Sequence, residues 1–224
     1  MTSTATWLAA FATVVTLVLY EAAVVLTQRH KPERLARSAH ASLREEWFAA
    51  VSSHPGSEIL AVQTLRNSLM SATMTASTAV LGLMGLMGSV TLAAPSLRSS
   101  LADTGADRLV FTPRVAIELM LMTLLFASLV CSAMAVRYYN HASIICAMPV
   151  GSAPRQRWSA SGSAYVRRAG LLYSWGLRHL VLVAPIVVFI VHPFAGPVAA
   201  IMVVLVLRSF DRVSSASAVA SDRV

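Results

Sequence analysis

Four apolar runs, each more than twenty residues long, constrain this chain more than any other feature. They occupy residues 7–27, 68–92, 114–136 and 180–207. A helix needs about 20 apolar residues to cross a hydrocarbon core roughly 30 Å thick. Only 12% of the residues are charged, against about 25% in an ordinary soluble domain. The sequence therefore predicts an all-α polytopic membrane protein with four transmembrane helices, in which residues 1–224 form a single membrane domain.

The second apolar run carries its smallest residues in alternating steps of three and four. They are Ser68, Ser71, Thr75, Thr78, Gly82, Gly85 and Ser89. On an α-helix such residues share one face, and stripes of this kind let helices approach closely in lipid. We expect this central helix to pack through the stripe, either within the chain or across the axis of a homo-oligomer. A pore lining is the less favoured alternative.

The connections at residues 28–67 and 137–179 hold six basic residues each. In the first, small and apolar side chains repeat at helical spacing and predict an amphipathic helix on the membrane or on a partner. These side chains are Ala36, Ala39, Leu43, Trp47 and Ala50. In the second, residues 164–179 mix arginine with aromatic side chains, which predicts another short interfacial helix. Residues 154–163, just before it, form the most linker-like stretch.

The basic residues also orient the spans, because short cytoplasmic loops carry an excess of Lys and Arg. The remaining connection and the tail hold only three basic residues each. This favours four spans with both termini outside the cytoplasm of a bacterial inner membrane. The proline-rich residues 193–197 leave an alternative, in which the last run folds back as a re-entrant hairpin and the C-terminus is cytoplasmic.

Several polar side chains are expected at the cytoplasmic ends of the spans. They are Arg66, Asn67, Arg137, Asn140, His141 and Arg178. Together they would form a basic vestibule that binds an anion at the mouth of a path. The alternative is that each arginine extends to the lipid headgroups and binds no solute.

Two acids, Glu21 and Glu118, lie inside the apolar runs. A carboxylate within a membrane is a candidate proton or cation site. By the predicted topology the two lie near opposite membrane faces and do not pair with each other. A structural ion pair is the favoured interpretation for both, with Arg66 or Arg137 as the expected partner of Glu21.

The sequence offers no support for an enzyme or a cofactor. The histidines lack metal-ligand spacing, and there is no phosphate loop, nucleophile elbow or catalytic triad pattern. Scattered methionines are typical of core packing rather than of copper binding. The basic residues cluster between apolar runs instead of on a polar module, so a nucleic-acid partner is not expected.

Four segments share a pattern with a known family. They are Gln63-Thr64-Leu65-Arg66-Asn67-Ser68-Leu69-Met70, Val136-Arg137-Tyr138-Tyr139-Asn140-His141, Tyr173 with Gly176-Leu177-Arg178, and the Gly196-Pro197 bend with Asp211-Arg212. In these the chain resembles the bacterial and plant membrane family catalogued as domain of unknown function 599 (DUF599). It departs from the family at His192-Pro193-Phe194-Ala195, where a Trp-rich, tighter approach to Gly-Pro is expected. The resemblance implies four membrane helices and no particular activity.

Two functions follow as hypotheses. The leading one is an oligomeric pore or transporter for a small solute that could be an anion, with the basic vestibule at its cytoplasmic mouth. The rival is a structural or accessory membrane subunit that binds lipid headgroups or a partner protein. A pore requires polar side chains along a hydrated path, whereas an accessory subunit keeps its seam dry and its basic residues at the headgroups.

Overall fold

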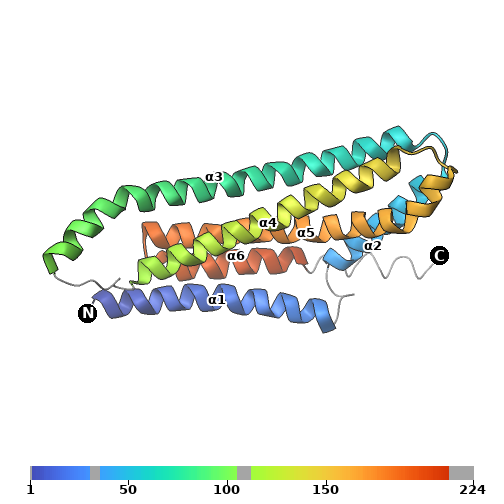
Figure 1. Cartoon of the computed structure of the whole chain (residues 1–224). Coiled ribbons are helices and arrows are strands. Elements are labelled where there is room, and N and C mark those ends of the chain that lie inside the picture. Colours follow the sequence, from blue (N-terminus) through green and yellow to red (C-terminus); the bar gives the residue numbers. More distant parts are fainter. Residues whose placement is uncertain (1, 31–35, 105–111, 212–224) are drawn as a thin grey trace.

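The protein is described by a computed structural model that covers residues 2–30, 36–104 and 112–211. Six helices, and no strand, occur in these residues (Figure 1). They are α1 (Thr2–His30), α2 (Ala36–Ser53), α3 (Glu58–Thr104), α4 (Pro113–Ala147), α5 (Ala153–Val191) and α6 (Ala195–Asp211). Of these, α1, α3, α4 and α5 are long and apolar enough to cross a membrane. The predicted all-α fold with four membrane-spanning helices is confirmed.

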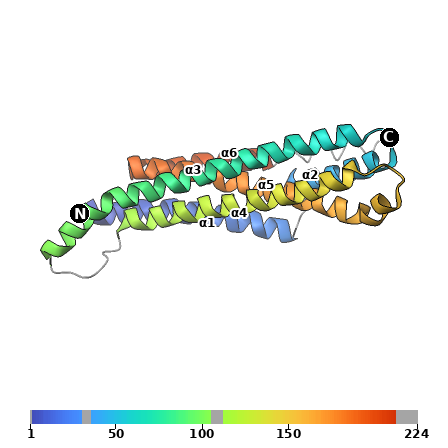
Figure 2. The ribbon, with the colours of Figure 1, turned by 45° about the horizontal axis from the view of Figure 1, so that its top comes forward.

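The long helices lie roughly side by side and form an elongated bundle (Figures 1 and 2). The α4–α5 and α3–α4 pairs make the most extensive contacts, while α1 packs mainly against α6 and α4. The short helix α2 lies beside α5 at the end of the bundle where α3 begins and α4 meets α5. One end of the molecule therefore extends as a layer of helices beyond the ends of α1 and α6.

Two buried clusters divide the core along the length of the bundle. The first lies among the apolar spans and includes Leu17, Ile117, Leu182 and Ile186. The second lies nearer α2 and includes Phe48, Leu65, Tyr139, Cys146 and Val166. Because apolar burial gives no net advantage between helices in lipid, ordinary hydrophobic stabilisation is expected from the members of the second cluster that lie beyond the apolar runs, such as Phe48 and Cys146.

The helix α4 begins at a Thr-Pro start signal and runs past the predicted end of its span. Thr112 accepts a hydrogen bond from the Val115 N–H at 3.3 Å, and Pro113 occupies the first turn, where its missing N–H costs nothing. The helix continues to Ala147, so the apolar residues after His141 extend it. Arg155 of α5 then donates to the carbonyls of Cys146 and Met148 at 2.8 and 2.6 Å. These bonds satisfy the end of α4 and fix the turn into α5.

The second connection is organised differently from the sequence prediction. Residues 154–163, expected as a linker, and residues 164–179, expected as a separate interfacial helix, are both part of the continuous helix α5. Pro154 does not interrupt the helix because it lies in the first turn. The aromatic side chains of this region are half-buried, and α5 packs here against α2 and α4, whereas Arg167 and Arg168 are exposed.

The last apolar run is also divided, and the prediction of one kinked span over residues 180–207 is corrected. Helix α5 ends at Val191, and α6 begins at Ala195 and runs back beside α5. His192 has an extended backbone, and turn bonds join Ala195 to His192 and Gly196 to Pro193. A Cβ on Gly196 would lie 2.7 Å from Phe189, so glycine permits the close return. The structure thus has the hairpin that the sequence left as an alternative, with the end of α6 directed toward the end of the bundle that holds α2.

Helix α2 is where the sequence predicts a helix, but it buries a different face. Its buried residues are Ala41, Phe48 and Val51, whereas Leu43 is 61% exposed. Phe48 packs over Gly162 of α5, and Arg44 packs over Gly170, about two turns further along the same side of α5. The predicted apolar face is therefore not the main buried face of α2. Gly162 and Gly170 of α5 have no side chains, so Phe48 and Arg44 of α2 can pack closely against them. The side chains of Ala36 and Ala39 lie outside the described residues.

Candidate functional site

The most concentrated polar arrangement within the spans is an ion pair that joins three helices. Arg178 of α5 donates from Nη2 to both carboxylate oxygens of Asp211 on α6, at 2.7 and 2.9 Å. Its Nη1 donates to the Tyr20 hydroxyl of α1 at 2.8 Å. The Tyr20 hydroxyl in turn donates to Asp211 at 3.2 Å. We call these three residues the intramembrane triad.

The intramembrane triad is shielded from solvent and surrounded by aromatic rings. The side chain of Arg178 is 6% exposed and that of Asp211 is 20% exposed. The guanidinium carbon of Arg178 lies 5.3 Å from the Tyr20 ring centre and 5.9 Å from that of Trp175. Trp175 also stacks on His179. The planar cation is therefore held by a bidentate carboxylate and by π-faces, which suit arginine better than lysine.

The depth of the intramembrane triad follows from contacts between neighbouring helices. Tyr20 precedes Thr27, the end of the first apolar run, by seven residues, or about 10 Å at 1.5 Å per residue. Close to Arg178, Gly176 accepts a hydrogen bond from Ser128 Oγ at 2.7 Å. Ser128 precedes Val136, the end of the third apolar run, by eight residues, or about 12 Å. Both estimates place the ion pair well inside the apolar spans.

This geometry can hold helices together, because an unpaired charge at such a depth is costly. Each member of the intramembrane triad satisfies the other two, and they come from α1, α5 and α6. The contact fixes the returning helix α6 against both the helix before it and the first helix of the chain. The intramembrane triad thus holds the two arms of the α5–α6 hairpin together and against α1.

The predicted vestibule is only partly assembled. Arg66, Asn67, Arg137, Asn140 and His141 are all exposed. Gly82 of α3 contacts Leu125 of α4. Arg66 lies sixteen residues before Gly82 on α3, and His141 lies sixteen residues after Leu125 on α4. Because the two helices are antiparallel, Arg66 and His141 lie at the same level along the bundle. Arg178 does not join them: it is buried in the intramembrane triad, deeper along α5.

The small-residue stripe of α3 divides between two faces. Thr75 is buried, and Ser68 and Gly82 are half-buried toward α4, where Ala61, Leu65, Ala72 and Ala79 complete the packed face. The exposed members are Ser71, Thr78 and Gly85. The side chain of Ser89 lies outside the described residues. Three members of the stripe thus pack within the chain, and three face outward.

The hydroxyl groups of α3 bond to their own helix. Ser71, Thr75 and Thr78 donate to the carbonyls of Asn67, Ser71 and Met74, respectively, at 2.9–3.1 Å. A hydroxyl that bonds to the carbonyl four residues earlier does not need water. The outward part of the stripe is therefore suited to lipid or to another helix.

The two intramembrane acids have different surroundings. Glu118 accepts a hydrogen bond from Arg114 Nε, one turn earlier on α4, at 2.9 Å, and the two side chains form an ion pair. Glu21 is half-buried and follows Tyr20 on α1. Within residues 2–30, 36–104 and 112–211, no group of three or more His, Cys, Asp or Glu side chains could hold a metal ion.

Sequence reasoning missed two members of the intramembrane triad. Tyr20 is one of many apolar or aromatic residues in the first run, and nothing in its local sequence marks it. Asp211 was noted only as part of the Asp211-Arg212 pair, of which Arg212 lies outside the described residues. The usable signal is that an acid follows the last apolar run by four residues, while Arg178 precedes that run by two. A hairpin at residues 192–194 brings two such flanking residues together.

A family model described as a protein of unknown function, DUF599, matches residues 8–216. The chain belongs to the DUF599 family. No curated protein and no solved structure matches it. The match covers nearly the whole of this DUF599 protein, including Tyr20, Arg178 and Asp211, and it confirms the resemblance stated from the sequence. The protein is thus a DUF599 membrane protein.

Proposed function

We propose that this DUF599 protein is a structural or accessory membrane subunit, without enzymatic activity, that assembles with further copies of itself through the outward face of α3. The observation that carries the proposal is the sparse packing of α3. Only 17% of its most apolar window is buried, against 33% for α1, α4 and α5. Helix α3 packs closely on α4 along one face, but the small buried share of its residues leaves a large surface available for another helix.

The outward face of α3 suits a close contact with a second copy. Ser71, Thr78 and Gly85 follow one another at steps of seven residues, so they form a line along the helix. A seven-residue repeat matches helices that cross at a small left-handed angle, and small side chains let the backbones approach. A Cβ added to Gly85 would meet no atom within 4 Å in the protomer. This glycine therefore has no packing role inside the chain.

The first prediction is that Gly85→Leu weakens self-association without destabilising the protomer. The leucine would separate two helices that meet at this line, and we expect association about tenfold weaker, equivalent to roughly 1.4 kcal/mol. Sedimentation equilibrium in a density-matched detergent measures the change. Ser77→Leu is the matched control, because Ser77 is also small and exposed but lies on another side of α3.

Equal association of wild type, Gly85→Leu and Ser77→Leu would refute assembly through this line. A purely monomeric wild type would refute the proposal itself. Thermal unfolding of all three proteins checks that the protomer is intact, as expected because a Cβ at Gly85 meets no atom within 4 Å and Ser77 is exposed.

A second candidate function is an anion pathway at the axis of such an assembly. It is favoured by one observation, the exposure of Arg66, Asn67, Arg137, Asn140 and His141 on the adjacent helices α3 and α4. Assembly through α3 would bring the copies of Arg66 and Asn67 near one another, where they would surround the mouth of a path. The hydroxyls of the stripe are self-bonded, so the path would depend on this mouth for selectivity.

For this candidate we expect current through planar bilayers containing the purified protein. The reversal potential should follow an imposed chloride gradient, and Arg66→Ala should reduce the chloride preference, because a cation at the mouth raises the local anion concentration. Arg29→Ala, at an exposed arginine of α1, is the control. Absence of both current and solute flux in wild type would eliminate the pathway and leave the structural role.

We also propose an orientation in a bacterial inner membrane. The N-terminus would be outside, and α2 and the α4–α5 turn would be in the cytoplasm, in line with the six basic residues in each of the connections 28–67 and 137–179. Because α6 returns toward α2, the basic residues that follow the last run would then also lie toward the cytoplasm. A topology with both termini outside would place the basic residues of the tail outside the cytoplasm, against the usual excess of basic residues in cytoplasmic segments. The return of α6 avoids this conflict.

A further inference from the structure

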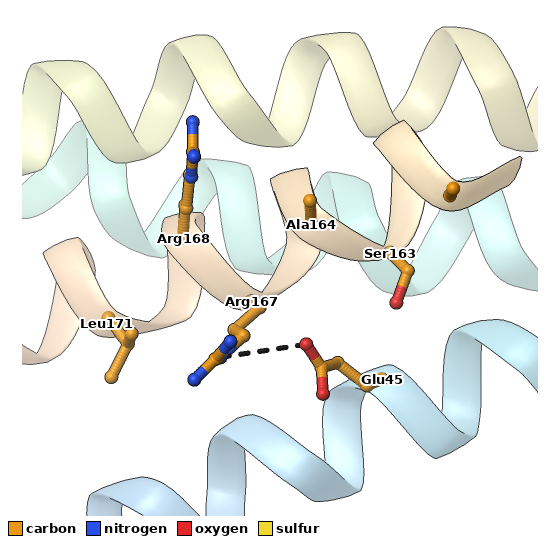
Figure 3. Close-up of a pocket in the computed structure, with 7 residues that line it drawn as sticks. Glu45, Ser163, Ala164, Arg167, Arg168 and Leu171 are labelled. Atoms are coloured by element: carbon orange, nitrogen blue, oxygen red, sulfur yellow. Dashed lines mark ion pairs between the residues drawn. The ribbon is translucent and has the colours of Figure 1, made fainter. Parts of the chain in front are cut away.

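A hollow lies between α2 and α5 outside the intramembrane triad. Its volume is about 410 Å³ (Figure 3). It is lined by Glu45 of α2 and by Ala160, Ser163, Ala164, Arg167, Arg168 and Leu171 of α5. The α5 residues recur at steps of three and four, so they form one face of that helix. The hollow is small and combines an apolar wall with charged side chains.

The charged side chains of the hollow are incompletely satisfied by one another. Arg167 Nε lies 3.6 Å from Glu45 Oε1, beyond hydrogen-bond distance, and the two side chains are 57% and 38% exposed. Figure 3 shows Arg167 directed toward Glu45 and Arg168 directed away from it. A guanidinium has five N–H donors in a planar fork that matches an oxyanion. Arg167 therefore has donors to offer to a ligand.

The depth of the hollow matches the level of lipid headgroups. Tyr165 of α5 stacks on Tyr138 of α4 with ring centres 5.7 Å apart. Arg167 and Arg168 follow Tyr165 along α5, and the antiparallel α4 has Val136 and Ala135 at the corresponding positions. Val136 is the last residue of the third apolar run. The two arginines thus lie where the apolar spans give way to the polar layer.

We propose that the hollow between α2 and α5 binds the phosphate of an anionic phospholipid. Arg167 donates to the phosphate oxygens, and Leu171, one turn further toward the spans, contacts the start of an acyl chain. The Glu45 carboxylate competes with the phosphate for Arg167, and its negative charge repels the phosphate. The hollow is too small and too close to the bilayer for a folded partner protein. The site does not depend on assembly through α3, because α2 and α5 alone form it.

Because Glu45 competes with the lipid, substitutions of Arg167 and Glu45 should change the lipid affinity in opposite directions. The full chain is purified in an uncharged detergent and titrated with phosphatidylglycerol or phosphatidylcholine, and native mass spectrometry counts the bound lipids. We expect wild type to prefer phosphatidylglycerol. Arg167→Gln should lower that affinity about fivefold, the effect of one basic residue at a membrane surface. Glu45→Gln should raise it, because the carboxylate no longer competes or repels.

Arg157→Gln is the control, since Arg157 is an exposed arginine of the same helix α5 that does not line the hollow. It should leave the affinity unchanged. The proposal is overturned if Arg167→Gln behaves like this control, or if Glu45→Gln weakens binding as Arg167→Gln does, which would mean that the pair only supports the fold. Inorganic phosphate provides the remaining test. If it binds the lipid-free protein and displaces phosphatidylglycerol in an Arg167-dependent way, the ligand is a free anion and not a lipid.

Discussion

Arg178→Gln is expected to destabilise the protein by about 3 kcal/mol or more, the usual loss when one partner of a buried ion pair is removed. The substitution leaves the Asp211 carboxylate inside the spans without its bidentate donor, and the Tyr20 hydroxyl loses a partner. The α5–α6 hairpin should then separate from α1 before the rest of the bundle unfolds. Equilibrium unfolding in mixed micelles measures the loss.

The control for this prediction is Arg208→Gln, one turn before Asp211 on α6. Arg208 is exposed, so its removal should change the stability by less than about 0.5 kcal/mol. The decisive comparison is the double variant Arg178→Met with Asp211→Leu. Because it strands no charge, we expect it to be more stable than either single variant. Additive losses in the double variant would show that the two residues are not coupled.

The ion pair also explains why the last apolar run can be a hairpin. The apolar part of α5 after Arg178 has thirteen residues, to Val191, and spans only about 20 Å, less than a hydrocarbon core. A chain that ended its span there would leave Arg178 within the bilayer. The return of α6 supplies Asp211 as its counter-charge. Pairing between the hairpin arms thus makes the polar position tolerable in lipid.

Much of the fold could be predicted because lipid imposes strict requirements on helix length. The first, second and third apolar runs lie within α1, α3 and α4. Helix α3 continues to Thr104, beyond its predicted end near Leu92. Apolar composition reports where a helix can lie in the bilayer, but it does not report where the helix stops in water.

The last run shows the limit of apolar periodicity. Residues 180–207 contain enough apolar residues for one span, and Pro193 alone fits either a kink or a turn. The choice depends on whether a returning helix finds partners, here Phe189 beside Gly196 and Arg178 beside Asp211. These are contacts between segments far apart along the chain, and no local pattern encodes them.

The candidate site could be predicted only residue by residue. Arg178 was identified as important, but as an exposed cation at a mouth, because residues near helix ends usually face water or headgroups. Its partners lie 158 positions before and 33 positions after it in the chain. Recognising the site therefore required knowing that α1 and α6 are neighbours, which follows from helix packing and not from charge patterning.

Gly176→Leu is expected to have the other large effect, a loss of about 3 kcal/mol or more from overpacking between α4 and α5. A Cβ at this position would collide with Ser132 Oγ and lie 3.2 Å from the backbone oxygen of Ser128. The hydroxyl can rotate away, but the backbone of α4 cannot move without separating the most extensively packed pair of helices in the bundle. Arg178, two residues further on, would shift with α5 and loosen its contact with Asp211.

Two measurements test this expectation. Unfolding midpoints should fall for Gly176→Leu but not for Gly88→Leu, because a Cβ at Gly88 has no neighbour within 4 Å. Maleimide should also label Cys131, a half-buried thiol next to Ser132, faster in Gly176→Leu than in wild type. The smaller change Gly176→Ala should be partly rescued by Ser132→Gly, which removes the hydroxyl collision and leaves only the backbone contact. If Gly176→Leu unfolds and labels like wild type, α4 and α5 do not pack as closely at this level as the glycine requires, and the position of Arg178 must be fixed from the α6 side alone.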